Sequence, residues 1–270
     1  MPVRLGNPCF GLGLDRDFQE SEETRMIRRI SSVAAAAVVT LTAAGAWAQA
    51  APGSFGTSGQ FAIGAERMFG YVHTTHKVER EAAGQTTTVT DSASQFSFLG
   101  MHGTDLDLGA EPMSHPRIGL DYFVIDRLSV GGSLIFMSRS TEGETETQGQ
   151  TLSGDGPSTT AFIFNPRVGY AFMFSDMFGI WPRGGFTYYS ISQDLDTPVG
   201  TRERSENGLA LTLEAMFVIT PIPHMGFTVG PTLDLGLTGG RDEQDPGQPN
   251  VEADAKITDI GLNAGVLVWF

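Results

Sequence analysis

The chain is 270 residues long, carries a net charge of −14 and contains a single cysteine, Cys9. So acidic a chain is a poor partner for nucleic acid, whose phosphates attract Lys and Arg, and we expect no nucleic-acid partner. Divalent cations or other surface ligands are better matched to its charge. The acidic and basic residues of the first fifty positions cancel, so the net charge is carried by the rest of the chain.

Positions 26–50 have the features of a secretory signal peptide. A basic start around Arg28 is followed by an apolar run from Val33 to Ala46, and small residues at Ala48 and Ala50 suit cleavage. The apolar run is shorter than the roughly 20 residues that a membrane-spanning helix needs. We therefore expect export and cleavage.

Residues 1–25 are acidic where a leader should be basic. We expect them to be untranslated, with translation starting at Met26, or disordered. Because Cys9 lies in this stretch, the exported domain at 51–270 has no thiol. Its composition therefore excludes disulfides, thiol catalysis and cysteine-ligated metal.

Residues 51–270 are predicted to form one all-β domain, a transmembrane antiparallel up-and-down β-barrel. Apolar and polar residues alternate in eight segments, as in strands with one face in lipid and the other in the barrel interior. In chain order the segments are 61–72, 117–125, 128–138, 161–174, 179–192, 209–219, 226–237 and 257–270. Arg67 interrupts the apolar face of the first segment, so we expect a β-bulge there.

The connections between these segments alternate in length, as they do in transmembrane barrels with short turns on one side and long loops on the other. Short turns lie at 126–127, 175–177 and 220–224, and long polar loops at 139–160, 193–207 and 239–255. The stretch 86–115 leaves the number of strands open. It is either an extension above the membrane, with a short strand at 95–100, or part of an extra pair that makes ten strands; we prefer eight.

The polar faces must turn toward the interior, because a Lys or Arg side chain facing lipid at mid-depth costs about 2–4 kcal/mol. We predict that they form a network of paired charges there. Its members are Glu66, Arg117, Asp121, Arg167, Arg183, Glu214 and Asp234. Since side chains can fill the interior of an eight-stranded barrel, the network predicts a plugged barrel. The same alternation directs Trp181 and Trp269 inward.

The signal peptide, the eight amphipathic segments, the unequal connections and the terminal Phe270 together resemble the small bacterial outer-membrane β-barrel proteins. The likeness is to the transmembrane domain of outer membrane protein A and its short relatives, and the hairpin at 116–132 is similar to one common in that class. The resemblance implies a cell outer-membrane location and contact with outer-membrane lipid. It also implies that the last strand is the signal for the barrel-assembly machinery, through its outward residues Leu262, Ala264, Val266, Val268 and Phe270.

The sequence predicts no catalytic, metal or cofactor site. His73 and His76 offer two metal ligands, but spacing specifies no third. We therefore expect a structural or surface-interaction role, with the loops 139–160 and 239–255 as the binding surface. Two alternatives stay open: a small porin-like channel for solutes, and a lipid-modifying enzyme with Ser138 and His73 at the outer rim.

Overall fold

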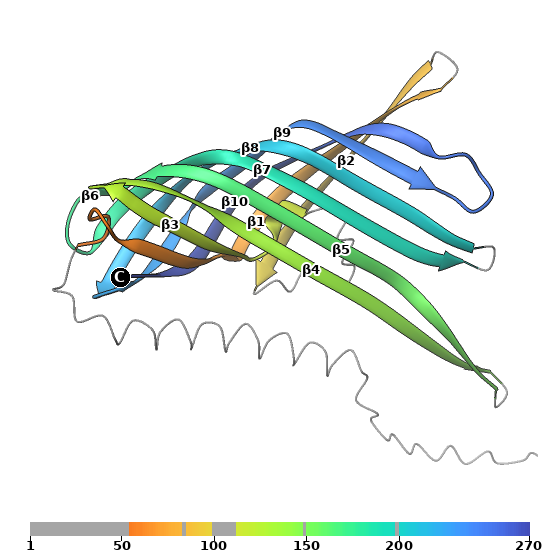
Figure 1. Ribbon diagram of the computed structural model, residues 1–270, viewed down its shortest axis with the longest axis horizontal. Coiled ribbons are helices and arrows are strands. Elements are labelled where there is room, and N and C mark those ends of the chain that lie inside the picture. The colour runs from red at the N-terminus through yellow and green to blue at the C-terminus, as the bar shows by residue number, and fades with distance from the viewer. Residues whose placement is uncertain (1–53, 83–84, 99–111, 148–149, 198–199) are drawn as a thin grey trace, which may run out of the picture. The chain divides into compact units, whose positions relative to one another are not determined.

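The computed structural model describes residues 54–82, 85–98, 112–147, 150–197 and 200–270. Residues 1–25, predicted to be untranslated or disordered, and the predicted signal peptide at 26–50 lie outside these ranges. The described chain is almost entirely strand, as the two-residue alternation predicts (Figure 1). Its elements are β1 (Phe61–Ala82), β2 (Gln85–Phe98), the 3-10 turn η2 (Pro112–Ser114), β3 (Arg117–Ile125), β4 (Leu128–Thr147), β5 (Gln150–Tyr170), β6 (Phe172–Met173), β7 (Phe178–Thr197), β8 (Gly200–Ile222), β9 (Met225–Gln244) and β10 (Val251–Trp269).

Eight antiparallel strands close into a ring, which confirms the predicted up-and-down β-barrel and the preference for eight strands. Neighbours in the ring are β1, β3, β4, β5, β7, β8, β9 and β10, and β10 returns to β1. This seam is long: it runs from the pair Ala62 and Trp269 to the pair Glu79 and Asp254. The two-residue β6 follows β5 and pairs with β7 near the short turn.

One edge of β1 has two different partners. Residues Phe61–Glu66 pair with β3, and residues Phe69–Ala82 pair with β2. The described part of the stretch up to Phe98 therefore extends the wall as a hairpin with β1, and its strand begins ten residues earlier than the short strand predicted at 95–100. Within the described ranges, β2 pairs only with β1, and β4 beyond Leu134 pairs only with β5. The wall between β2 and the outer half of β4 is thus not joined by described backbone hydrogen bonds, and these strands diverge in Figure 1.

The two faces of the wall have opposite chemistry. In β3 every second residue is buried, and the residues between them are exposed. Ile118 is 64% exposed and Asp121 only 1%, the reverse of their order in a water-soluble sheet. Exposed apolar residues cover the outside of the other strands too, for example Val130, Phe136, Phe162, Phe186, Leu213, Phe227 and Leu262. An apolar band of this extent needs lipid, since each Å² left in water costs about 25 cal/mol.

The long connections are not irregular loops, as the sequence analysis assumed, but paired strands. β4 and β5 continue to Thr147 and Gln150, and β7 and β8 to Thr197 and Gly200. Between β9 and β10 pairing resumes from Val251. The reason is that a backbone N–H or C=O needs a partner, and Thr- and Ser-rich segments that leave the membrane satisfy these groups by extending the ladder. No helix in the described residues is long and apolar enough to cross a membrane.

Candidate functional site: a filled barrel interior

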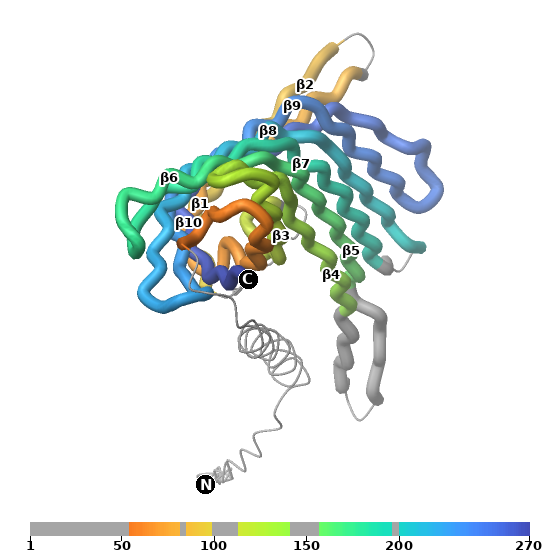
Figure 2. Tube along the Cα trace, turned by 60° about the vertical axis from the view of Figure 1, so that its left-hand side comes forward, coloured from red at the N-terminus to blue at the C-terminus, as the bar shows by residue number. Residues whose placement is uncertain are grey.

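The interior is closed at the short-turn end by an aromatic cluster around Phe55. The stretch before β1 curls across the end of the ring, beside the C-terminus (Figure 2). The ring centroid of Phe55 lies 5.2 Å from those of Phe123 and Trp181, and 5.3 Å from that of Trp269, all in edge-to-face geometry. This is the favoured arrangement for aromatic pairs. Both tryptophans are 2% exposed, which confirms that the alternation directs them inward.

A tight turn holds Phe55 in place. Gly56 and Gly59 have φ values of +93° and +87°, in the region that favours glycine. The side-chain oxygen of Gln60 accepts hydrogen bonds from the backbone N–H groups of Gly56 and Thr57. The turn is tied to the ring, because the N–H of Arg127 donates to the carbonyl of Gly56 at 2.6 Å. The structure thus adds a floor that the charge pattern of the strands did not reveal.

Above this floor, Arg167 is the hub of a buried ion-pair network. Its two terminal nitrogens lie 2.7 and 2.6 Å from the carboxylate oxygens of Glu66, and its Nε lies 3.2 Å from Asp121 Oδ1. Arg183 joins the other side, with Nη1 2.6 Å from Glu66 Oε1 and Nη2 2.7 Å from Glu214 Oε2. Five of the seven predicted residues therefore meet in one cluster drawn from five strands.

The structure places the remaining two predicted residues at the edge of this cluster. Asp234 is fully buried and reaches the network through Arg67, whose Nη1 lies 2.6 Å from Asp234 Oδ2. Arg117 donates instead to the carbonyl oxygen of Met113 at 2.9 Å, and more weakly to Ser133. Arg117 therefore fixes η2 inside the ring.

Arg67 is the member of the network that the sequence analysis missed. The predicted bulge occurs here, with a register shift between Ala65 and Phe69 and a positive φ of 53° at Arg67. The bulge turns the side chain from the lipid face to the interior, where it is 2% exposed and also lies 3.2 Å from Glu214. An arginine on an otherwise outward face was the available signal, because its cost in lipid demands an inward solution.

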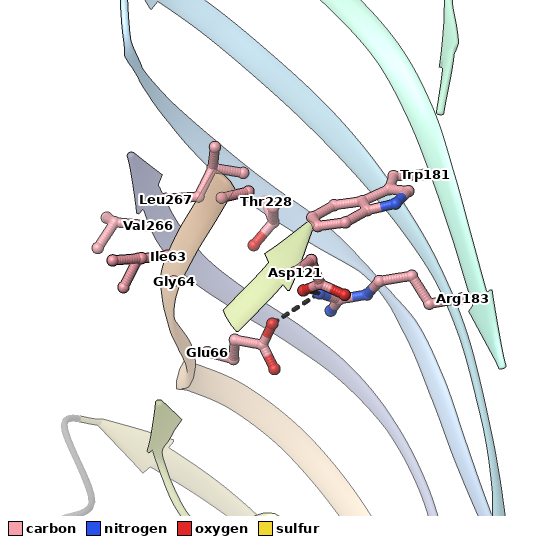
Figure 3. Close-up of a pocket in the computed structure, with 10 residues that line it drawn as sticks. Ile63, Gly64, Glu66, Asp121, Trp181, Arg183, Thr228, Val266 and Leu267 are labelled. Atoms are coloured by element: carbon pink, nitrogen blue, oxygen red, sulfur yellow. Dashed lines mark hydrogen bonds and ion pairs between the residues drawn. The ribbon is translucent and has the colours of Figure 1, made fainter. Parts of the chain in front are cut away.

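Little space remains between the floor and the network. A small cavity lies beside Trp181, Arg183, Glu66 and Asp121 (Figure 3), and its volume is about 10 Å³. That is room for about one water molecule. The cation of Arg183 stacks on the Trp181 ring, 4.6 Å from its centroid, and so joins the two layers.

Beyond the network, toward the long hairpins, the interior becomes apolar. The buried members of this outer cluster are Met113, Ile135, Ala161, Ile163, Tyr189, Ile191, Ala210 and Ile257, with Met137 partly buried against them. η2 carries Met113 into the ring and contacts β5 and β7. Through Ile135 and Met137 the cluster reaches the part of β4 for which the described strands offer no second partner.

The histidines that the structure describes form no common metal site. His73 bonds Ser94 at 2.8 Å on the outside, whereas His76 is buried, with Nε2 3.1 Å from Glu206 Oε1. His102 lies outside the described ranges. Across the described residues, no group of three or more His, Cys, Asp and Glu side chains is placed to hold a metal ion. Ser138 is exposed on β4, and the side chain of His73 bonds Ser94 and not Ser138.

The last strand completes the seam. The backbone groups of Phe270 and Phe61 bond each other in both directions, at 2.9 and 3.0 Å, and their rings stack with centroids 5.9 Å apart. Leu262 and Phe270 are exposed on the outer face, and Ala264, Val266 and Val268 lie half-buried between them. Recognition of this strand by the assembly machinery stays a prediction.

The comparisons with known proteins agree with this architecture. The outer membrane protein OprG from Pseudomonas aeruginosa is similar over 79% of this chain and 97% of its own, with 14% identity and a TM-score of 0.50. This chain has the fold of the small bacterial outer-membrane β-barrels. The outer-membrane protein AlkL matches with 10% identity over 82% of this chain and 94% of its own, at a TM-score of 0.46. The Escherichia coli outer membrane protease OmpT matches with 10% identity over 78% of this chain and 97% of its own, at a TM-score of 0.45. No family model and no curated protein sequence matches the chain.

Proposed function

We propose that this outer-membrane barrel is a closed anchor that displays four polar β-hairpins outside the cell, in a structural or surface-interaction role. The observation that carries the proposal is the filled interior. The Phe55 cluster, the ion-pair network and the outer apolar cluster follow one another along the barrel axis. A cavity of about 10 Å³ is the space found between the first two layers.

The hairpins are the surface that such an anchor presents. They are formed by β1 with β2, β4 with β5, β7 with β8 and β9 with β10. Paired strands hold side chains in fixed rows, which suits recognition better than an irregular loop does. The acidic stretches 139–160 and 239–255 match divalent cations or basic surface ligands in charge.

Planar-bilayer recording of the purified barrel tests the closed interior. We expect no steady conductance above that of the empty bilayer. A stable open channel in the unmodified protein would refute the proposal. Calcium titration by calorimetry tests the display role. The control is a variant in which residues 139–160 are replaced by a two-residue turn. Equal calcium binding by both proteins would show that these residues do not belong to the binding surface.

A second candidate function is passage of small apolar solutes sideways through the wall. The observation in its favour is that the outer apolar cluster reaches, through Ile135 and Met137, the edge of β4 that pairs with no strand among the described residues. Met113→Arg places a charge in that cluster and should abolish uptake of a small apolar dye into barrel-containing vesicles. Met177→Arg, at an exposed turn residue, is the matched control. Equal uptake by both variants and the unmodified barrel would eliminate this route.

A further inference from the structure

Three arginines gather on the inner wall near the outer mouth, beyond the apolar cluster. Arg80 comes from β1, Arg204 from β8 and Arg241 from β9. Arg241 is the ladder partner of the buried Glu206, and Arg204 is the partner of Glu243. Residues directly opposite one another share a face of a sheet, so these four side chains all face inward. Arg80 reaches the same place, because its Nη2 lies 2.6 Å from Glu243 Oε2.

Glu243 binds Arg80, but the carboxylates present do not satisfy Arg204 and Arg241. The side chains of Arg204 and Arg241 are only 19% and 15% exposed. Yet the carboxylate oxygens that face them lie 3.8 Å from Arg204 Nη2 and 3.7 Å from Arg241 Nη2, too far for a hydrogen bond. The Nε of Arg241 is buried and has no acceptor within the described part of the chain. Guanidinium groups removed from water normally acquire such acceptors.

The three arginines at this point repel one another. Burial, and then the neighbouring charge of Arg204, lower the pKa of Arg241. Arg80 adds to this repulsion, while Glu243 and Glu206 oppose it. Three arginines face two glutamates, which leaves an excess of one positive charge in a chain whose net charge is −14. An arrangement that concentrates cations where anions are plentiful needs a further partner.

We propose that Arg80, Arg204 and Arg241 form a binding site for a phosphate group. The planar guanidinium fork matches phosphate oxygens in pairs, and three arginines from three strands can surround a tetrahedral anion. The missing acceptors of Arg204 and Arg241 are then the phosphate oxygens. Because the side chains face the interior, the site is reached from the outer mouth, by free phosphate, by a phosphorylated solute or by the headgroup of a lipid.

The test is a calorimetric titration of the full chain in uncharged detergent with inorganic phosphate, using chloride to hold ionic strength constant. We expect R204Q and R241Q each to weaken binding by about tenfold or more, the effect of losing charged hydrogen bonds. Lys77→Gln is the matched control, because this substitution also removes one positive charge, but from the exposed outer face of β1. Equal weakening by all three variants, or no binding by the unmodified chain, would overturn the site.

A variant expected to bind phosphate more tightly separates loss of the site from misfolding, because a misfolded protein would bind more weakly. Glu243→Gln removes the negative charge that competes with phosphate for Arg80 and Arg241, so phosphate binding should tighten several-fold; weaker or unchanged binding contradicts the proposed geometry. Nanodiscs with and without phosphatidic acid separate a lipid headgroup from a soluble phosphate ligand. Competition between this lipid and inorganic phosphate assigns the site to a headgroup, and undisturbed phosphate binding assigns it to a soluble ligand.

Discussion

Replacing Phe55 with alanine should loosen the floor of the barrel and lower its stability substantially. The Phe55 side chain is 3% exposed and touches three aromatic rings, so its removal leaves a cavity against Phe123, Trp181 and Trp269. Substitutions of buried Phe by Ala cost about 3–5 kcal/mol. Because a turn outside the ring carries Phe55, the neighbours cannot collapse fully into the space. We therefore expect a loss in the upper part of that range.

Urea unfolding of the barrel in phospholipid vesicles measures this change. Trp181 and Trp269 both contact Phe55, so tryptophan emission should shift to the red in the folded state of the variant as well. Phe174→Ala is the control, since Phe174 is 71% exposed in the short turn after β6 and its replacement should cost about 1 kcal/mol or less. A loss below about 1 kcal/mol for Phe55→Ala would refute the claim that this residue closes the floor.

Further predictions concern the network, the glycines and the seam. Arg167→Met should cost about 3–5 kcal/mol in the same urea assay, because it leaves Glu66 and Asp121 charged and buried; a stable variant would mean that the network is not structural. Gly185→Ala should destabilise by about 1–3 kcal/mol, since an added Cβ would lie 2.1 Å from the carbonyl oxygen of Pro166. Gly240→Ala should change stability by about 0.5 kcal/mol or less, because the added Cβ would meet no neighbouring atom within 4 Å. Phe270→Ala should reduce the heat-modifiable, folded fraction in cells much more than refolding in vitro; equal effects would argue against an assembly signal.

The barrel wall could be predicted from the sequence because a lipid-facing strand obeys a strict rule. Charge in lipid is costly, so alternation alone placed Asp121, Arg167 and Arg183 inside, where the structure has them. The rule holds only between the interfaces. Beyond them neither face needs to be apolar, so the outer halves of β4 and β5 resembled loops although they form a ladder with a single register shift, between Ser140 and Glu142.

The filling of the interior was less predictable, because it depends on segments that are not strands of the ring. Phe55 and Met113 lie in stretches without period two, and their burial follows from tertiary contacts alone. Arg67 was predicted to disturb the strand, but its partner Asp234 is 167 residues away in the chain. The bulge decides whether the Arg67 side chain lies on the lipid face or the interior face of the strand. The spacing of residues in the sequence does not reveal which face it takes.

The double partnership of β1 has a consequence for how the cylinder is sealed. A solitary first strand waiting in the bilayer would present unmatched amide and carbonyl groups to hydrocarbon, at several kcal/mol each. From Phe69 to Ala82 this strand already has its own mate on one side. We therefore expect the closing pair of β1 and β10 to form on a strand whose other edge is already hydrogen-bonded, which leaves fewer backbone groups of β1 without partners before closure.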